Sequence, residues 1–181
     1  MRFLLAIAAG LLLTSPVLGR QDDPRLSDLF ATLKTQEDPR AVKMLETAIW
    51  GVWMQSGSDT VDLLLNRGTQ AMGAGDYPTA LQLFTSIVEL DPNFAEGWNK
   101  RATLFYLMGA YDRSTADVEK TLALEPRHFG ALSGLGMINM QLGKEKEALD
   151  AFEKALAVNP HMEAIKSEAA RLKKKLEGSR I

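Results

Sequence analysis

A period of 34 residues constrains the fold of this sequence more than any other feature. Pro92, Pro126 and Pro160 are spaced by this interval. Shifting the chain by the same interval aligns six further columns, so one structural unit fills each period. The columns are Gly75/Gly109/Gly143, Leu64/Trp98/Leu132, Gly68/Ala102/Gly136, Ala80/Ser114/Ala148, Phe84/Val118/Phe152 and Ile87/Thr121/Ala155.

Each period predicts a pair of helices. In the first unit, Leu64 and Gly68 fall at helical spacing, and Gly75 follows as the residue that best adopts the left-handed cap of a helix. A second apolar stripe includes Ala80 and Phe84 and ends before the repeating proline. Small residues recur where the paired helices approach closely, so that large neighbours can fill the groove between them.

These units resemble tetratricopeptide repeats, whose 34-residue pattern is a helix–turn–helix that ends in proline. The resemblance implies an all-α fold, a right-handed α-solenoid with capping helices at both ends. It divides the chain into an N-terminal segment (20–60), three repeats (61–160) and a C-terminal capping helix with a tail (161–181). The three repeats are assigned to 61–94, 95–128 and 129–160.

The flanking segments are predicted to cover the ends of the array, because stacked repeats expose an apolar face at each end. Asp23-Pro24 opens a short helix and Asp38-Pro39 opens a longer one. The expected apolar faces of the three flanking helices are Leu26, Leu29, Phe30 and Leu33; Met44, Leu45, Ala48, Ile49 and Val52; and Met162, Ile165, Ala169, Leu172 and Leu176, with Lys173, Lys174 and Lys175 largely off the last face.

Residues 1–19 have the pattern of a secretory signal peptide. Arg2 precedes an apolar run from Phe3 to Leu13, and Gly19 follows a helix-breaking Pro16. We expect cleavage near Gly19 and a location outside the cytoplasm, in a bacterial periplasm. The alternative is an uncleaved anchor that tethers the same domain. No later stretch is apolar enough to span a membrane, since a span needs about 20 apolar residues.

The composition offers little for catalysis, metals, cofactors or nucleic acid. The 181 residues include no cysteine, and we interpret the two histidines, His128 and His161, as turn residues. Carboxylate pairs such as Asp22/Asp23 are interpreted as solvated charges. A net charge of −2 provides no field for a polyanion. We therefore predict a protein that is not an enzyme, with no catalytic residue, cofactor or metal and no nucleic-acid partner.

The resemblance implies a partner-binding groove on the concave face, built mainly from the first helix of each unit. The Met, Asn and Thr side chains expected in this groove suit a peptide or a partner helix, because Met adapts its shape and Asn or Thr can bond a peptide backbone. The alternative is that the Met and Tyr side chains cover neighbouring helices or a self-contact. The groove residues are Asp62, Leu65, Thr69 and Met72; Glu96, Asn99, Thr103 and Tyr106; and Gly130, Ser133, Met137 and Met140.

Some members of the family clamp a partner's C-terminal carboxylate with Lys, Arg and Asn. The matching positions here are Leu65, Thr69, Lys100, Gly130 and Gly134, so the clamp is missing and chaperone tails are not predicted as ligands. The leading hypothesis is a non-catalytic scaffold that binds a protein or peptide in the cell envelope. The alternative is an architectural subunit that associates with itself, in an oligomeric state that the sequence leaves open.

Tryptophans decide which surfaces are free for such contacts. Trp98 shares a column with leucines and is predicted to be a core residue, whereas Lys100 and Arg101 beside it are predicted to be solvated. Trp53 is expected to be buried on the first repeat. Trp50 would mark a second interaction surface if exposed; either this tryptophan helix or the C-terminal helix would then serve self-association.

Overall fold

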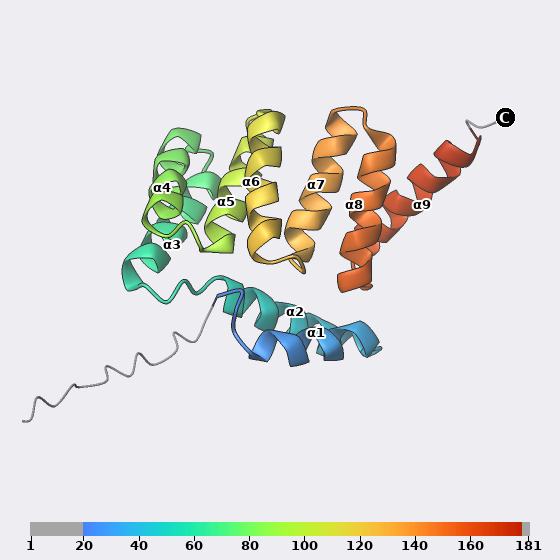
Figure 1. The fold of residues 1–181 in the computed structure, drawn as a ribbon, viewed down its shortest axis with the longest axis horizontal. Helices are drawn as coiled ribbons and strands as arrows, with labels where there is room; N and C mark the ends of the chain where they lie inside the picture. The colour runs from blue at the N-terminus through green and yellow to red at the C-terminus, as the bar shows by residue number, and fades with distance from the viewer. Residues whose placement is uncertain (1–19, 179–181) are drawn as a thin grey trace, which may run out of the picture.

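The computed structural model describes residues 20–178, which form helices with no strand among them. Six helices form three antiparallel pairs that stack side by side in chain order as an α-solenoid, as the sequence predicts (Figure 1). The second helices of the pairs begin 34 residues apart. The pairs are α3 (Asp59–Gly73) with α4 (Tyr77–Leu90), α5 (Ala95–Leu107) with α6 (Tyr111–Leu124), and α7 (Phe129–Gln141) with α8 (Glu145–Val158).

The glycine column closes the first helix of every pair. Gly75, Gly109 and Gly143 have φ values of 78°, 72° and 71°, in the left-handed region that a residue with a Cβ rarely adopts. The predicted helix caps are thereby confirmed at all three turns.

The small-residue column lets the paired helices approach one another. A Cβ built on Gly68 of α3 would lie 2.5 Å from Cε1 of Phe84 in α4, whose ring is fully buried. The corresponding Cβ on Gly136 would lie even closer to Phe152.

The structure therefore predicts that Gly68→Ala lowers the free energy of unfolding by about 1–3 kcal/mol, because the buried ring must move. Chemical denaturation measures this cost. Gly73→Ala is the matched control in the same helix, since its new Cβ meets no described atom within 4 Å. An equal or smaller loss of stability in Gly68→Ala than in Gly73→Ala would contradict the packing argument.

The flanking helices cover apolar surface at two different places. Helix α9 (Glu163–Gly178) packs on α8, with Ala169 and Leu172 buried beside Phe152. Lys173, Lys174 and Lys175 are exposed, as predicted. At the other end of the chain, α1 (Arg25–Thr35) and α2 (Pro39–Trp53) form a pair that we call the N-terminal hairpin.

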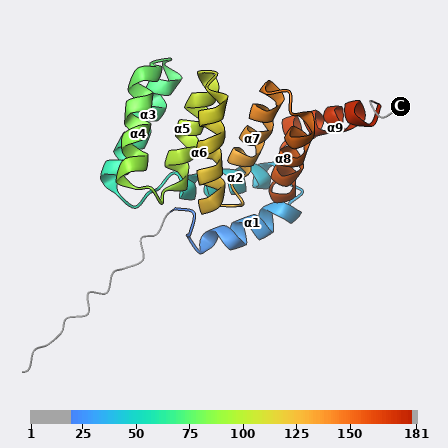
Figure 2. The same cartoon turned by 45° about the horizontal axis from the view of Figure 1, so that its top comes forward.

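The N-terminal hairpin lies along the edge of the array, beneath the loops that join successive repeats (Figures 1 and 2). Just before it, the Arg20 guanidinium pairs with Asp91 at 3.2 Å in the first of these loops. Further along, His161 Nε2 donates to the Leu33 carbonyl at 2.8 Å, and Asn159 Nδ2 donates to Glu46 Oε1 at 2.8 Å. Loops after the first and third repeats are thus tied to one N-terminal segment.

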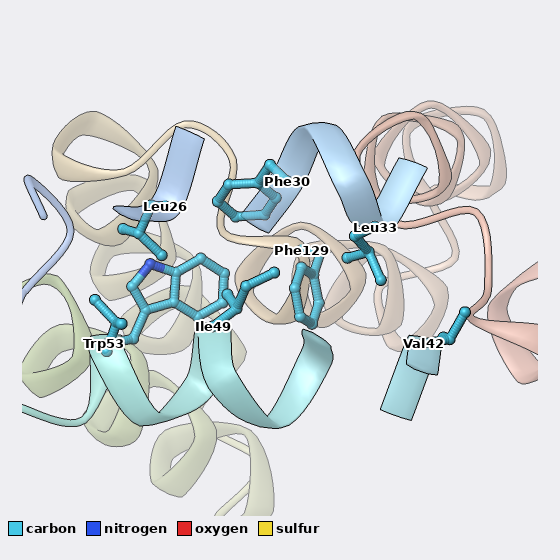
Figure 3. Close-up of a cluster of buried hydrophobic side chains, with 8 residues drawn as sticks. Leu26, Phe30, Leu33, Val42, Ile49, Trp53 and Phe129 are labelled. Carbon is cyan, nitrogen blue, oxygen red and sulfur yellow. The ribbon is translucent and has the colours of Figure 1, made fainter. Parts of the chain in front are cut away.

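A hydrophobic cluster joins the N-terminal hairpin to the third repeat (Figure 3). Trp53 is 1% exposed, so its predicted burial is confirmed, but its ring contacts Phe30, His128 and Phe129 instead of the first repeat. The members of the cluster are Leu26, Phe30, Leu33, Val42, Ile49, Val52, Trp53 and Phe129.

The apolar face predicted for α2 needs a correction. Met44 is 73% exposed and Ala48 is exposed, whereas Val42 and Trp53 are buried. The buried face is rotated because α2 packs on α1 and on the start of α7. The predicted start of α2 is confirmed, since Asp38 caps the helix by accepting from the Arg40 amide and Pro39 is its first residue. Helix α1 begins one position later than the same pattern implies: Asp23 accepts from the Arg25 amide, but the N-cap is Pro24, which has no side-chain cap bond.

Candidate functional site

A hollow of about 210 Å³ opens between the second and third repeats. Helices α5, α6 and α7 supply its walls, and most of its lining is apolar or small. The lining residues are Asn99, Ala102, Thr103, Tyr106, Ser114, Val118, Gly130, Ala131, Ser133, Gly134, Met137 and Ile138.

The hollow exists because α7 carries glycine where a side chain could fill the space. A Cβ built on Gly134 would meet no described atom within 4 Å. At the edge of the hollow, Met137 is 38% exposed and the Tyr106 ring lies 5.7 Å from that of Tyr111. Within the described part of the chain, no charged residue lines the hollow. It therefore suits an uncharged group. The Thr103 and Ser133 hydroxyls already donate to the backbone carbonyls of Asn99 and Gly130, so they remain to a ligand as hydrogen-bond acceptors.

A buried polar cluster lies at one side of the hollow, between the starts of α5 and α7. Glu96 Oε2 accepts from Nδ2 of Asn99 at 2.9 Å and from Nε2 of His128 at 3.0 Å. The other ring nitrogen of His128, Nδ1, accepts from the Ala131 amide at 3.0 Å and caps α7. These partners assign the neutral Nε2–H tautomer, because Nδ1 acts as an acceptor.

The charge of Glu96 is balanced inside the fold. Burial raises the pKa of its carboxyl, but the hydrogen bond from His128 and the nearby charge of Lys100 outweigh burial and lower the pKa below the ordinary 4.5. Lys100 Nζ lies 3.2 Å from Glu96 Oε1. The cluster therefore holds a carboxylate at neutral pH.

This lowered pKa predicts a dependence of stability on pH. A carboxyl whose pKa is lower in the folded state stabilises the fold fully above its unfolded value of 4.5. That contribution is lost as the pH falls through the folded pKa. We expect the unfolding free energy of the wild type to fall below pH 4.5 more steeply than that of Glu96→Gln, measured by denaturation from about pH 7 to 3. Parallel curves would contradict the assignment of the slope to Glu96.

The N-terminal hairpin covers this cluster with two indole rings. Trp53 stacks on His128, with ring centroids 4.1 Å apart and an interplanar angle of 8°. Trp50 meets His128 edge-on at 5.4 Å, and a Cβ on Gly130 would lie 2.8 Å from the Trp50 ring. Gly130 thus allows Trp50 to pack beside the hollow. Trp50 is half-buried, so it is not the freely exposed anchor considered from the sequence.

Only some of the predicted groove residues lie together around the hollow; the others are buried or bonded elsewhere. Glu96 and Leu65 are each 1% exposed, so neither presents a free side chain. Asp62 accepts from the Ser56 amide and hydroxyl, while Thr69 donates to the Leu65 carbonyl. Met72 and Met140 pack on neighbouring helices. The predicted residues that line the hollow are Asn99, Thr103, Tyr106, Gly130, Ser133 and Met137.

Three interpretations of residues near the site are corrected. Trp98 is half-buried, and its Nε1 donates to the Pro92 carbonyl, so it is not a fully buried core residue. The predicted solvation of Lys100 and Arg101 is wrong, since Lys100 pairs with Glu96 and Arg101 makes two hydrogen bonds to Asp117.

The remaining corrections concern polar residues in loops. Asp23 is 4% exposed and binds Arg25, so it is not a solvated charge. His128 does lie in a turn, but it is completely buried. Its pairing with Glu96 was missed because 32 residues separate the two. The one sequence signal for this pairing was the repeat period, which places the starts of α5 and α7 in adjacent units.

Residues 20–178 contain neither a metal-ligand cluster nor a membrane-spanning helix. No group of three or more His, Cys, Asp or Glu side chains there could hold a metal ion. Likewise, none of the helices in that range combines the length and apolar character required to cross a bilayer. The predicted signal segment, residues 1–19, lies outside the described residues.

Comparison with known sequences gives consistent matches. Two sequence models described as tetratricopeptide repeat match residues 65–119 and 130–162. A TPR repeat-containing protein of Rhizobium etli is 38% identical over 156 residues, which cover 86% of this chain and 76% of that protein. The small glutamine-rich tetratricopeptide repeat-containing protein 2 of Mycosarcoma maydis is 31% identical over 62% of this chain. The chain spans 32% of that second relative.

Solved structures share the fold at low sequence identity. The first TPR domain of Spaghetti (RPAP3), bound to the HSP90 peptide SRMEEVD, has a TM-score of 0.63 at 22% identity and covers 66% of this chain and 95% of its own. The type III secretion translocator chaperone SycD of Yersinia enterocolitica has a TM-score of 0.64 at 19% identity, with coverage of 66% and 96%.

Proposed function

Because the chain belongs to the tetratricopeptide repeat family, we propose that it is a non-catalytic scaffold that binds a protein or peptide segment in the hollow between its second and third repeats. The observation that carries this proposal is the hollow itself, which is uncharged, open and left unfilled by Gly134. The hydroxyl oxygens of Thr103, Ser133 and Tyr106 line it and can accept hydrogen bonds from the N–H groups of an extended peptide backbone.

The lining favours an apolar segment over an acidic tail. The Spaghetti domain binds an HSP90 peptide that ends in Glu-Glu-Val-Asp, so the same fold can hold a peptide. In this chain the one cation at the clamp-like positions, Lys100, is paired with buried Glu96. A carboxylate ligand would have to compete with that ion pair. An apolar side chain of the ligand would instead gain about 25 cal/mol of binding free energy for each Å² of its apolar surface that the hollow buries.

Filling the hollow tests the proposal. Gly134→Leu adds a side chain where there is open space, and it should not destabilise α7, because leucine favours helix more than glycine does. We expect recovery of the partner by in-cell crosslinking from the concave face to fall about tenfold, corresponding to a loss of about 1.4 kcal/mol.

The matched control is Gly51→Leu, the same change at an exposed glycine in α2 whose Cβ also meets no described atom within 4 Å. Its crosslinking pattern should equal that of the wild type. Undiminished recovery of the partner by Gly134→Leu would remove the hollow as the binding site.

An extracytoplasmic location is part of the proposal. It is supported by the sequence of residues 1–19, with its apolar run and small Gly19. Mass spectrometry of the protein recovered from the cell envelope is expected to find a chain that starts near Arg20. A full-length chain in the envelope would favour a tether, and a cytoplasmic chain would contradict export.

Self-assembly is the less supported alternative. The Trp50 surface suggested for it is half-buried, with the ring 5.6 Å from Phe129 and close to Gly130. Of the two surfaces that the sequence suggested for self-association, only the exposed side of α9 is then left. Sedimentation over a range of concentrations distinguishes the two, since a monomer throughout would eliminate the self-associating subunit.

A further inference from the structure

We propose that the N-terminal hairpin sets the geometry of the hollow through His128, so that docking of the hairpin and occupation of the hollow are coupled. The identity of the occupant rests on the proposed function. The coupling itself concerns contacts within this chain and can be measured without any partner.

His128 connects two walls of the hollow. On the α5 side, its Nε2–H donates to Glu96 Oε2, and the same oxygen holds the amide of Asn99, which lines the hollow. On the α7 side, its Nδ1 accepts from the backbone of Ala131, another lining residue. One imidazole therefore fixes the positions of a side chain and a helix start on opposite sides of the hollow.

The N-terminal hairpin keeps water away from this imidazole. His128 is 0% exposed because Trp53 covers one ring face and Trp50 meets the ring edge-on. Release of the hairpin would expose the His128–Glu96 bond, and water would then compete for both partners. An exposed hydrogen bond restrains its partners less than a buried one does. Asn99 and the first turn of α7 would consequently be held less firmly.

A second contact links the same two elements directly. The Trp50 ring packs where Gly130 has no side chain, and Gly130 also lines the hollow. Movement of α2 therefore changes the packing at the edge of the hollow even with His128 in place. By thermodynamic reciprocity, an occupant that needs the docked geometry stabilises docking to the same extent.

Thiol labelling measures the coupling, because the chain contains no cysteine of its own. Met137→Cys places a thiol in the hollow, which we call the hollow reporter. Leu142→Cys places a matched thiol just beyond the end of α7, which we call the control reporter. The two native residues are 38% and 37% exposed. The rate of reaction with N-ethylmaleimide is then compared in full-length chains with and without a change at His128.

His128→Asn separates coupling from helix capping. Asparagine is a good N-cap residue, so it can bond the Ala131 amide, but it is too short to reach Glu96. We expect this change to raise the reaction rate of the hollow reporter about fivefold or more, the lower end of typical couplings, and to leave that of the control reporter within about twofold. His128→Gln, which can reach Glu96, should restore most of the original rate at the hollow reporter.

Trp53→Leu tests the coupling from the side of α2. It removes the ring that stacks on His128 and should raise the rate of the hollow reporter while the amides of α1 and α2 lose protection in hydrogen exchange. Release of the hairpin with an unchanged rate at the hollow reporter would overturn the proposal, as would equal increases at the two reporters. Loss of partner crosslinking alone would instead count only against the proposed function.

Discussion

Trp53→Ala is expected to lower the free energy of unfolding by about 3–5 kcal/mol, the usual cost of truncating a buried tryptophan. The ring is 1% exposed and packs against Phe30, His128 and Phe129. Its loss opens a cavity between α1, α2 and the start of α7. Chemical denaturation at neutral pH measures the cost, and hydrogen exchange shows whether α1 and α2 lose protection first.

Trp98→Ala is the matched control. Trp98 is half-buried, so less apolar surface is lost, and we expect a cost below about 2 kcal/mol. Comparable costs at the two positions would contradict the conclusion that the N-terminal hairpin is anchored by Trp53. They would instead favour the prediction from the repeat pattern, which placed Trp98 in the core.

The repeat period predicted the solenoid well because the residues that recur are those that the local geometry of each helix pair requires. A left-handed turn needs glycine, and a close helix pair needs a small residue opposite a large one; both requirements recur in every unit. Gly75, Gly68 and Phe84 therefore had the structural roles that their columns indicated. The first two helices are outside this pattern. Their amphipathic faces predicted that they cover apolar surface, but not that they lie along the loops.

The candidate site was only partly predictable, because position in a repeat does not determine exposure. The pattern selected Thr103, Tyr106 and Met137, which do line the hollow. It also selected Glu96, which is buried because His128 donates a hydrogen bond to it and Lys100 compensates its charge. The hydrogen bond from His128 depends on neighbouring repeats being docked.

The depth of the hollow and the cover provided by α2 also come from tertiary packing. Gly134 has no side chain, which leaves space between α5 and α7, and Gly130 provides room for Trp50 of α2. The sequence shows both glycines but not what occupies the adjacent space. The site is therefore a property of the second and third repeats and the N-terminal hairpin together.

Glu96→Ala is expected to lower the free energy of unfolding by about 3–5 kcal/mol, as the removal of one member of a buried charged cluster usually does. The change leaves the His128 Nε2–H and the Asn99 amide without their acceptor, although His128 is completely buried and Asn99 is only 7% exposed. It also leaves Lys100 without its carboxylate. Equilibrium denaturation at neutral pH gives the total cost.

Two further variants separate the causes of this loss. Glu96→Gln keeps an oxygen acceptor of the same shape, so it should cost less than half as much as Glu96→Ala if unsatisfied donors dominate. Glu163→Ala removes an exposed carboxylate paired with Lys166 and should cost no more than about 1 kcal/mol. If Glu96→Ala cost as little as Glu163→Ala, the cluster would not hold α5 to α7. The route from the N-terminal hairpin to the hollow would then have to run through Trp50 and Gly130 alone.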